Sequence, residues 1–167
     1  YVESPATRQL LKKLWGGMPP ERRAVADVFE YLVIVSSIIR PAANVFADAF
    51  VRRAHGQRYC SLHPLLDEVL AETHGIMVYQ EDVMKVAVAL GGFSVEDGDQ
   101  LRKVLSKKHK ARQLRDYQRQ FYDGASVRGL TRPVIDQVWA MIMSFAGYSF
   151  CKPHSASYAQ VSFKSAY

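Results

Sequence analysis

The sequence contains only two cysteines, Cys60 and Cys151, among its 167 residues. Two cysteines this far apart do not form a disulfide framework, so a reducing compartment is the expected environment. Long apolar runs are also missing, because the longest, residues 28–39, carries Glu30 and is too short to span a bilayer. No signal peptide is visible. We therefore expect a cytoplasmic protein with no membrane partner.

The familiar catalytic and metal-binding patterns are missing as well. No glycine-rich phosphate loop of the Walker or Rossmann type occurs, and no set of nucleophile, base and acid stands out. Asp97 and Asp99 can pair for a metal, but they suit the first turn of a helix better. The paired spacing of a structural zinc site is not found among the nearby metal-binding side chains, His55, Cys60, His63 and His74. The sequence predicts no metal site and no self-contained active centre.

Nearly every segment shows helical spacing, and the sequence predicts an all-α fold. Ser4 can N-cap a first helix that ends at the glycine pair 16–17. Pro20 begins a helix that is expected to run into residues 28–39, although the β-branched residues of that run leave a strand as the alternative. We also expect a short extended segment near residues 76–79. A chain of this length can bury its core as one compact multi-helix domain.

The net charge of +6 is concentrated in residues 100–128, which hold nine Lys and Arg against two Asp. Ser94, followed by Asp97, resembles a capping box that starts a helix into this segment. Residues three and four apart share a helix face, so one outer stripe carries three cations, Arg102, Lys103 and Lys107. A clustered positive stripe is typical of proteins with a polyanionic partner. A solvated helix face explains the same charge equally well.

The segment GYSFCKPHSASYAQVSFKSAY, residues 147–167, places Lys152 and His154 at the start of a predicted helix. Positive charge is unfavourable there, because the N-terminal end of a helix is itself positive. The arrangement makes sense if an anion such as a phosphate docks at that end. Together with the stripe, these groups could converge on a triphosphate.

The chain resembles the fingers region of bacterial replicative DNA polymerases of the C family, the DNA polymerase III alpha subunits. The similar stretches follow the family's order across nearly the whole chain: ESPATRQLLKKL (3–14), SIIRPAANVFADAFVRRAHG (37–56), HPLLDEVLAETHGIMVYQEDVM (63–84), GFSVEDGDQLRKVLSKK (92–108) and FAGYSFCKPHSASYAQVSFKSAY (145–167). The ordered set of matches carries the resemblance, since no single motif is specific enough alone.

This resemblance implies that the segment contacts the incoming deoxynucleotide and the templating base pair. The groups that would face the nucleotide's phosphates match three motifs of the family, an Arg pair, a following Lys pair and a Lys-x-His: Arg102, Lys103, Lys107, Lys108, Lys152 and His154. The charge on the next helix would act on nucleic-acid phosphates through Arg112, Arg115 and Arg119. Lys103 replaces the family's more usual Arg and loses its two-pronged grip on phosphate.

The resemblance also implies a division of labour within a longer chain. We expect residues 1–167 to be the fingers domain, with residues 1–17 as its connection from the palm. The family's catalytic aspartates belong to the palm, so this segment is expected to catalyse nothing alone, and Mg²⁺ would be bound in the full-length enzyme. Expected partners are primer–template DNA, deoxynucleoside triphosphates and other replicase subunits. The turn Arg40-Pro41-Ala42-Ala43 departs from the family's usual Arg-Pro-Gly-Pro, and this departure fits a divergent or error-prone relative.

Two other functions are compatible with the residues alone. One is a stand-alone basic helical module that binds nucleic acid without catalysis. The other is a helical protein-interaction domain whose charges only solvate its surface. The upstream sequence would distinguish them from a polymerase, because a polymerase requires an Asp-x-Asp pair and a third Asp encoded there.

Overall fold

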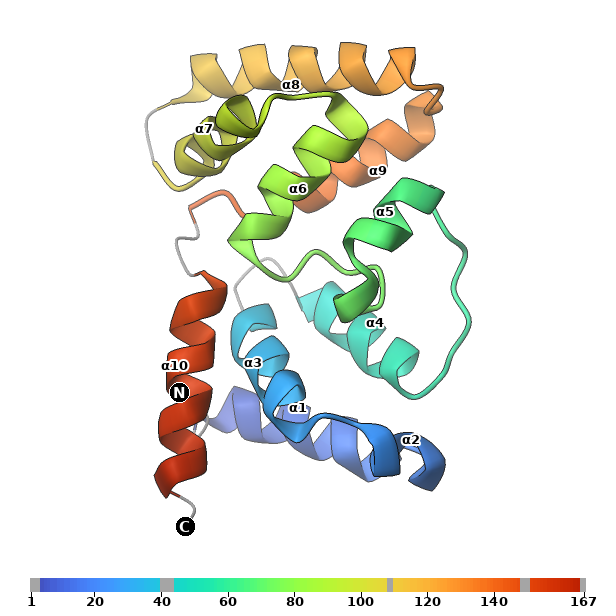
Figure 1. The fold of residues 1–167 in the computed structure, drawn as a ribbon, viewed down its shortest axis with the longest axis vertical. Helices are drawn as coiled ribbons and strands as arrows, with labels where there is room; N and C mark the ends of the chain where they lie inside the picture. Colours follow the sequence, from blue (N-terminus) through green and yellow to red (C-terminus); the bar gives the residue numbers. More distant parts are fainter. Residues whose placement is uncertain (1–3, 40–43, 108–109, 148–150, 166–167) are drawn as a thin grey trace. The chain divides into compact units, whose positions relative to one another are not determined.

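The computed structural model describes residues 4–39, 44–107, 110–147 and 151–165 (Figure 1). Within these ranges every regular element is a helix, which confirms the predicted all-α class. The chain divides into two compact units. Unit 1 comprises residues 1–59 and 150–167, and unit 2 comprises residues 60–149. None of the helices in the described ranges has both the length and the apolar character needed to cross a membrane.

Unit 1 contains five helices in its described part: α1 (Pro5–Gly17), α2 (Pro20–Val25), α3 (Val28–Ile38), α4 (Asn44–Ala54) and α10 (Lys152–Ser165). Ser4 caps α1 as predicted, since its side chain accepts the Thr7 N–H at 3.2 Å. The prediction of one helix from Pro20 into residues 28–39 is wrong. Asp27 interrupts it and caps α3 by accepting the Glu30 N–H at 3.1 Å, because a short Asp side chain competes well for helix N-terminal donors.

Helix α3 lies at the centre of unit 1, and every residue from Leu32 to Ile38 is buried. The strand alternative for this run is therefore wrong. Ser36 and Ser37 are tolerated inside because their hydroxyls donate to the Leu32 and Val33 carbonyls, at 2.7 and 2.9 Å. Burial on all sides selects a helix despite its β-branched residues, since a helix satisfies its own backbone.

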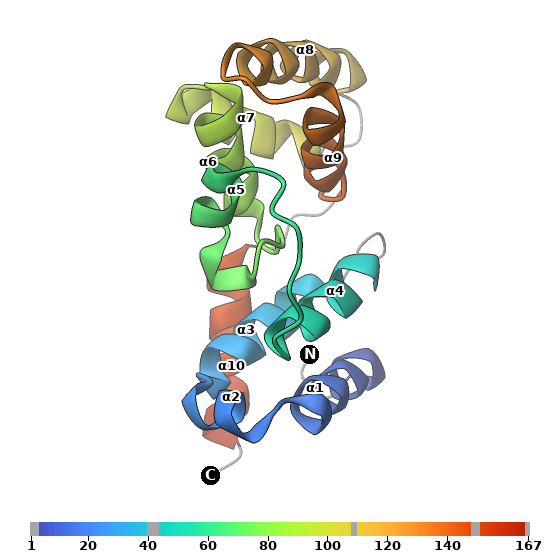
Figure 2. The same cartoon turned by 90° about the vertical axis from the view of Figure 1, so that its right-hand side faces the viewer.

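Helix α10 packs along α3, so two segments far apart in the sequence lie side by side (Figures 1 and 2). The Ser37 and Ser155 hydroxyls hydrogen-bond to each other, and both residues are buried. The Phe29 and Phe163 rings meet edge to face, with their centroids 5.7 Å apart. These contacts make the C-terminal helix part of the core of unit 1.

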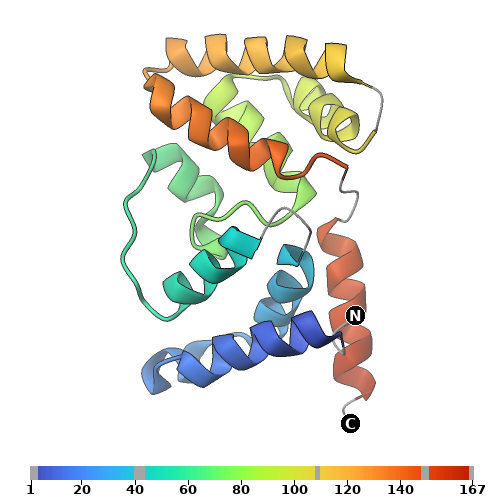
Figure 3. The same cartoon turned by 180° about the vertical axis from the view of Figure 1, so that it is seen from behind.

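Unit 2 contains α5 (Pro64–Val69), the 3-10 turn η1 (Ala71–Thr73), α6 (Gln80–Gly91), α7 (Val95–Leu105), α8 (Ala111–Val127) and α9 (Arg132–Met143). Helix α6 contacts α5, α7 and α8, and α9 follows α8 through a short turn and packs beside it (Figure 3). Residues 76–79 precede α6 outside any helix and are fully buried, and Tyr79 has the expected extended backbone. The buried α6 thus packs against both α7 and α8.

Candidate functional site

Helix α7 positions the first group of predicted phosphate-binding residues. Its start is fixed by Ser94, whose hydroxyl accepts the Asp97 N–H at 3.0 Å. The Asp97 carboxylate accepts from the Ser94 hydroxyl rather than from its backbone, so the expected capping box is only half formed. Three apolar side chains of α7 face the core as predicted: Leu101, Val104 and Leu105. Arg102 and Lys103 consequently project from the outer side of the helix.

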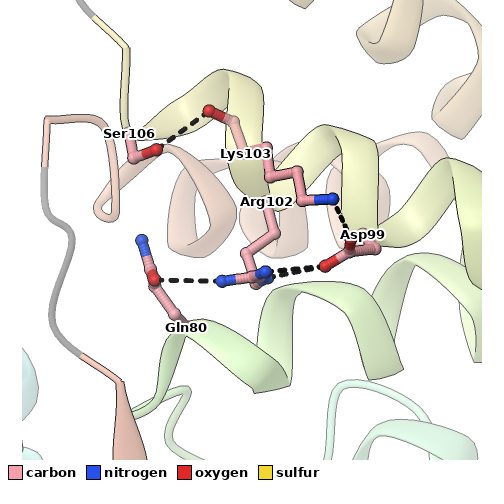
Figure 4. Close-up of polar contacts among 5 residues, drawn as sticks. All are labelled: Gln80, Asp99, Arg102, Lys103 and Ser106. Carbon is pink, nitrogen blue, oxygen red and sulfur yellow. Dashed lines mark hydrogen bonds and ion pairs between the residues drawn. The ribbon is translucent and has the colours of Figure 1, made fainter. Parts of the chain in front are cut away.

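Arg102 and Lys103 converge on a single carboxylate, that of Asp99 (Figure 4). Asp99 Oδ1 accepts from Arg102 Nε at 2.9 Å and from Arg102 Nη2 at 2.7 Å. Asp99 Oδ2 lies 2.7 Å from Lys103 Nζ. A fourth contact links Arg102 Nη1 to the Gln80 side-chain oxygen on α6, at 3.4 Å. The two adjacent cations therefore already share one anionic group.

The Asp99 carboxylate is ionised under ordinary conditions. Its hydrogen bonds with Lys103 and then Arg102 hold its pKa below the usual range for aspartate. Its side chain is 31% exposed, and that of Lys103 is 50% exposed, so solvent weakens the attraction. The cluster is accessible to a ligand and carries one net positive charge.

The lysine pair that follows α7 is described only in part. Lys107 is exposed, and its backbone N–H donates to the Val104 carbonyl at 3.1 Å as the helix ends. Lys108 lies outside the described residues, as does the predicted turn Arg40-Pro41-Ala42-Ala43. Lys107 extends the outer stripe that begins with Arg102 and Lys103.

Lys152 and His154 occupy the first turn of α10, as the sequence predicted. Lys152 is half-buried and His154 is exposed. The backbone N–H groups of His154 and Ser155 point back to the Cys151 carbonyl, at 3.1 and 3.4 Å. These two residues belong to unit 1, whereas the Arg102 group belongs to unit 2.

The three predicted DNA-contacting arginines, Arg112, Arg115 and Arg119, all lie on α8 and are exposed. Their spacing of three and four residues places them along one side of the helix. The opposite side of α8 contributes Phe121 and Ala125 to the core. No ion pair joins these three arginines to another described residue, and two exposed acids, Asp116 and Asp123, lie on the same helix, so the basic face of α8 has a small net positive charge.

Metal-binding groups do not gather anywhere in the described part of the chain, where no three of its His, Cys, Asp and Glu residues come together. Two of the histidines considered for zinc serve the fold instead. His55 Nε2 lies 2.8 Å from the Leu14 carbonyl oxygen and must carry the proton, because a carbonyl only accepts. His63 Nδ1 accepts the Leu65 N–H at the start of α5.

Sequence reasoning missed the role of Asp99 and the contribution of Gln80. It treated Asp99 as a residue of the helix first turn, although the spacing to Arg102 and Lys103 is the i,i+3 and i,i+4 spacing of helix ion pairs. That spacing was a usable signal. Gln80 lies in a different helix, so no local pattern could have linked it to Arg102.

Comparison with known proteins identifies the family of the chain. Residues 2–129 match the model of the bacterial DNA polymerase III alpha subunit finger domain. The chain therefore belongs to the family of bacterial DNA polymerase III alpha subunit finger domains, and the predicted resemblance is confirmed.

Several relatives support this membership over most of the chain. DNA polymerase III subunit alpha of Neisseria meningitidis serogroup A is 40% identical over 139 residues, 83% of this chain and 12% of that protein. The Aquifex aeolicus protein of the same description is 37% identical over 169 residues, 99% of this chain and 14% of that protein. An error-prone DNA polymerase of Symbiobacterium thermophilum is 33% identical over 99% of this chain and 15% of its own length. The chain thus spans about one seventh of the length of its relatives.

Proposed function

We propose that residues 1–167 form the fingers region of a bacterial DNA polymerase, which binds the incoming deoxynucleoside triphosphate and the template in DNA-templated deoxynucleotidyl transfer. Residues 1–17 would connect this region to the palm. Membership in the finger-domain family supports the proposal and argues against a stand-alone basic module or a protein-interaction domain.

The observation that carries the proposal is the shared anion of Arg102 and Lys103. Two cations held within 2.7 Å of one carboxylate are spaced to meet one anionic group, and both remain partly exposed. Phosphate oxygens resemble carboxylate oxygens in charge and in the hydrogen bonds they accept. The same outer stripe would bring Lys107 to the nucleotide's phosphates, and Lys108 would act there as the second member of the family's lysine pair.

Lys152 and His154 would bind a phosphate at the start of α10. The positive end of the helix favours an anion and disfavours the two added cations. A bound phosphate removes that conflict. In the full-length enzyme, Lys152 would neutralise charge on the triphosphate. His154 would supply a proton to the leaving pyrophosphate.

The other partners follow from the same reading. Arg112, Arg115 and Arg119 would contact phosphates of the primer–template, and further replicase subunits would bind the parent chain. In the full-length enzyme, Mg²⁺ would be bound by carboxylates of the palm. The segment alone would bind nucleotides weakly and extend no primer. We propose a cytoplasmic location for the parent protein.

The test is single-nucleotide insertion by the full-length polymerase carrying Lys152→Ala or His154→Ala. Lys152→Ala should lower kcat/KM for the nucleotide. The loss should correspond to about 2–4 kcal/mol of transition-state stabilisation if the contact tightens in the transition state. His154→Ala should act in the same direction, with a larger share of its effect in kcat. Affinity for primer–template without nucleotide should stay near wild type, because these residues would not hold the duplex.

Lys164→Ala provides the matched control, since Lys164 is an exposed lysine in the last turn of the same helix. It should leave insertion unchanged. If Lys152→Ala and His154→Ala reduce melting temperature, DNA affinity and insertion together, the two residues shape the fold of α10 and the phosphate assignment is wrong.

A further inference from the structure

Arg102 is held from two helices before any nucleotide arrives. A guanidinium carries five N–H donors in a fixed plane. Asp99 accepts from the Nε–Nη2 edge, and the Gln80 oxygen on α6 accepts from Nη1 at 3.4 Å (Figure 4). Two of the five donors remain, one on Nη1 and one on Nη2. These two donors remain for an oxyanion such as a phosphate.

The anchors of this arrangement are unequal in exposure. Gln80 is 3% exposed at the start of α6, so it provides a fixed point in the core. Asp99 is part of α7 and lies three and four residues before the two cations, so its distance to them is set by the helix. Lys103 has a long side chain with a compact ammonium that would otherwise sample many rotamers. The bond to Asp99 Oδ2 at 2.7 Å restricts it to the neighbourhood of Arg102.

We propose that Asp99 is a positioning residue for the incoming nucleotide: its carboxylate fixes Arg102 and Lys103 so that their remaining donors face one phosphate group. This inference rests on the proposed function and adds a residue that makes no contact with the nucleotide itself. A donor set that is fixed in advance loses less side-chain entropy when the ligand binds. Asp99 opposes the phosphates by its charge, and the gain in orientation outweighs that repulsion because the carboxylate is half-solvated.

Asp99→Asn in the full-length polymerase tests the proposal. The amide keeps the size of the carboxylate but offers one accepting oxygen, so it cannot hold Arg102 and Lys103 together. KM for the incoming nucleotide should rise about three- to tenfold, within the range found for coupled neighbours. The melting temperature and the primer–template affinity should stay near wild type, since the ion pairs are partly exposed.

Asp97→Asn is the matched control. It removes the same charge from the same helix turn, at a residue whose side chain accepts from the Ser94 hydroxyl. KM should be unchanged in this variant. A lower KM in Asp99→Asn would overturn the proposal, because the carboxylate would then act only by repelling the phosphates. An equal rise of KM in both variants would also overturn it, because the effect would not depend on the contacts that Asp99 makes with Arg102 and Lys103.

A variant that lacks both cations distinguishes failure of this inference from failure of the proposed function. The double variant Arg102→Gln/Lys103→Gln should raise KM strongly, and adding Asp99→Asn should then change KM less than about twofold, because Asp99 acts through the two cations. If the double variant raises KM but Asp99→Asn alone does not, the positioning role is wrong while the phosphate site stands. If the double variant leaves KM unchanged, the phosphate site itself is wrong.

Discussion

At the residue scale, the buried carboxylate of Asp82 stabilises the start of α6, the helix that carries Gln80. It lies in the first turn of α6, two residues after Gln80, and is 3% exposed. Its Oδ2 accepts the backbone N–H groups of Val78 and Tyr79, at 3.0 and 2.8 Å. These bonds fix the buried segment that leads into α6, and thereby the position of Gln80 beside Arg102.

The stability of the protein should depend on pH through Asp82. Burial raises its pKa above the ordinary aspartate value, and the bonds from Tyr79 and Val78 oppose this only in part. The folded carboxyl therefore keeps its proton at pH values where the unfolded one has lost it. The free energy of unfolding consequently falls as the pH rises from the ordinary aspartate pKa through the raised one.

Asp82→Asn removes this titration and keeps one accepting oxygen for both N–H groups. Its stability relative to wild type should improve as the pH rises through that window. Asp82→Ala should be less stable than Asp82→Asn by about 1–3 kcal/mol throughout, because it lacks the acceptor at every pH. Urea unfolding of the three proteins at acidic and neutral pH measures both effects. Parallel pH profiles for Asp82→Asn and wild type would contradict the assignment of the raised pKa.

At the scale of elements, the crossing of α6 and α8 depends on two glycines. A Cβ placed on Gly124 would lie 1.8 Å from the carbonyl oxygen of Gly91, which belongs to the backbone and cannot move away. Gly91 ends α6, whereas Gly124 lies inside α8, where glycine is otherwise unfavourable by about 1 kcal/mol relative to alanine. The close approach of the two helices explains why glycine is present.

Gly124→Ala should therefore destabilise the protein by about 1–3 kcal/mol or more, in spite of the better helix propensity of alanine. Gly16→Ala is the control, because Gly16 is also helical and nothing lies within 4 Å of its added Cβ. That variant should be neutral or slightly more stable. Denaturant unfolding followed by far-UV circular dichroism compares them, and equal stability of the two variants would refute the tight crossing.

The basic face of α8 makes a second prediction at this scale. Each phosphate contact adds about 0.9 to the slope of log affinity against log salt for duplex DNA. Replacing Arg112, Arg115 and Arg119 with Gln should flatten that slope for binding of the full-length protein to primer–template. Arg132→Gln should change it little, because Arg132 is already paired with Asp136 at 3.1 Å. An unchanged slope in the triple variant would mean that the α8 arginines face solvent and contact no DNA.

At the scale of the whole molecule, the chain enters unit 1, leaves it for unit 2, and returns with α10. The return matters because α10 covers α3, the most buried helix of unit 1. The predicted phosphate-binding residues Lys152 and His154 begin this helix. The turn that carries them is therefore anchored to a core built by the first part of the chain.

Removing residues 150–167 should destabilise unit 1 and spare unit 2. Truncation would expose the face of α3 around Ser37 and Phe29, whereas residues 60–149 form their own compact unit. Hydrogen exchange should show lost protection in α1, α3 and α4 and retained protection in α6 and α9. Equal loss in both units would mean that they fold as one cooperative body.

Local chemistry determined a large part of this structure. The caps Ser4 and Ser94, the glycines that end α1 and α6, and the prolines that begin α2 and α5 act within one turn of a helix, so the sequence predicts them directly. The order of the family's motifs likewise follows from the sequence alone. That order is enough to predict the family without any tertiary contact.

Tertiary structure decided the rest. The run 28–39 has the composition of a strand, and only the burial of residues 32–38 on all sides, with α10 packed against α3, makes it a helix. The pairing of Arg102 with Gln80 joins two helices that local periodicity cannot relate. The raised pKa of the buried Asp82 carboxyl and the helix crossing at Gly124 likewise depend on neighbours that only folding brings near. The sequence by itself determined the helices, their ends and the charges they carry, because those depend on near neighbours; which charges meet, and which residues tolerate no change, depended on packing between distant segments.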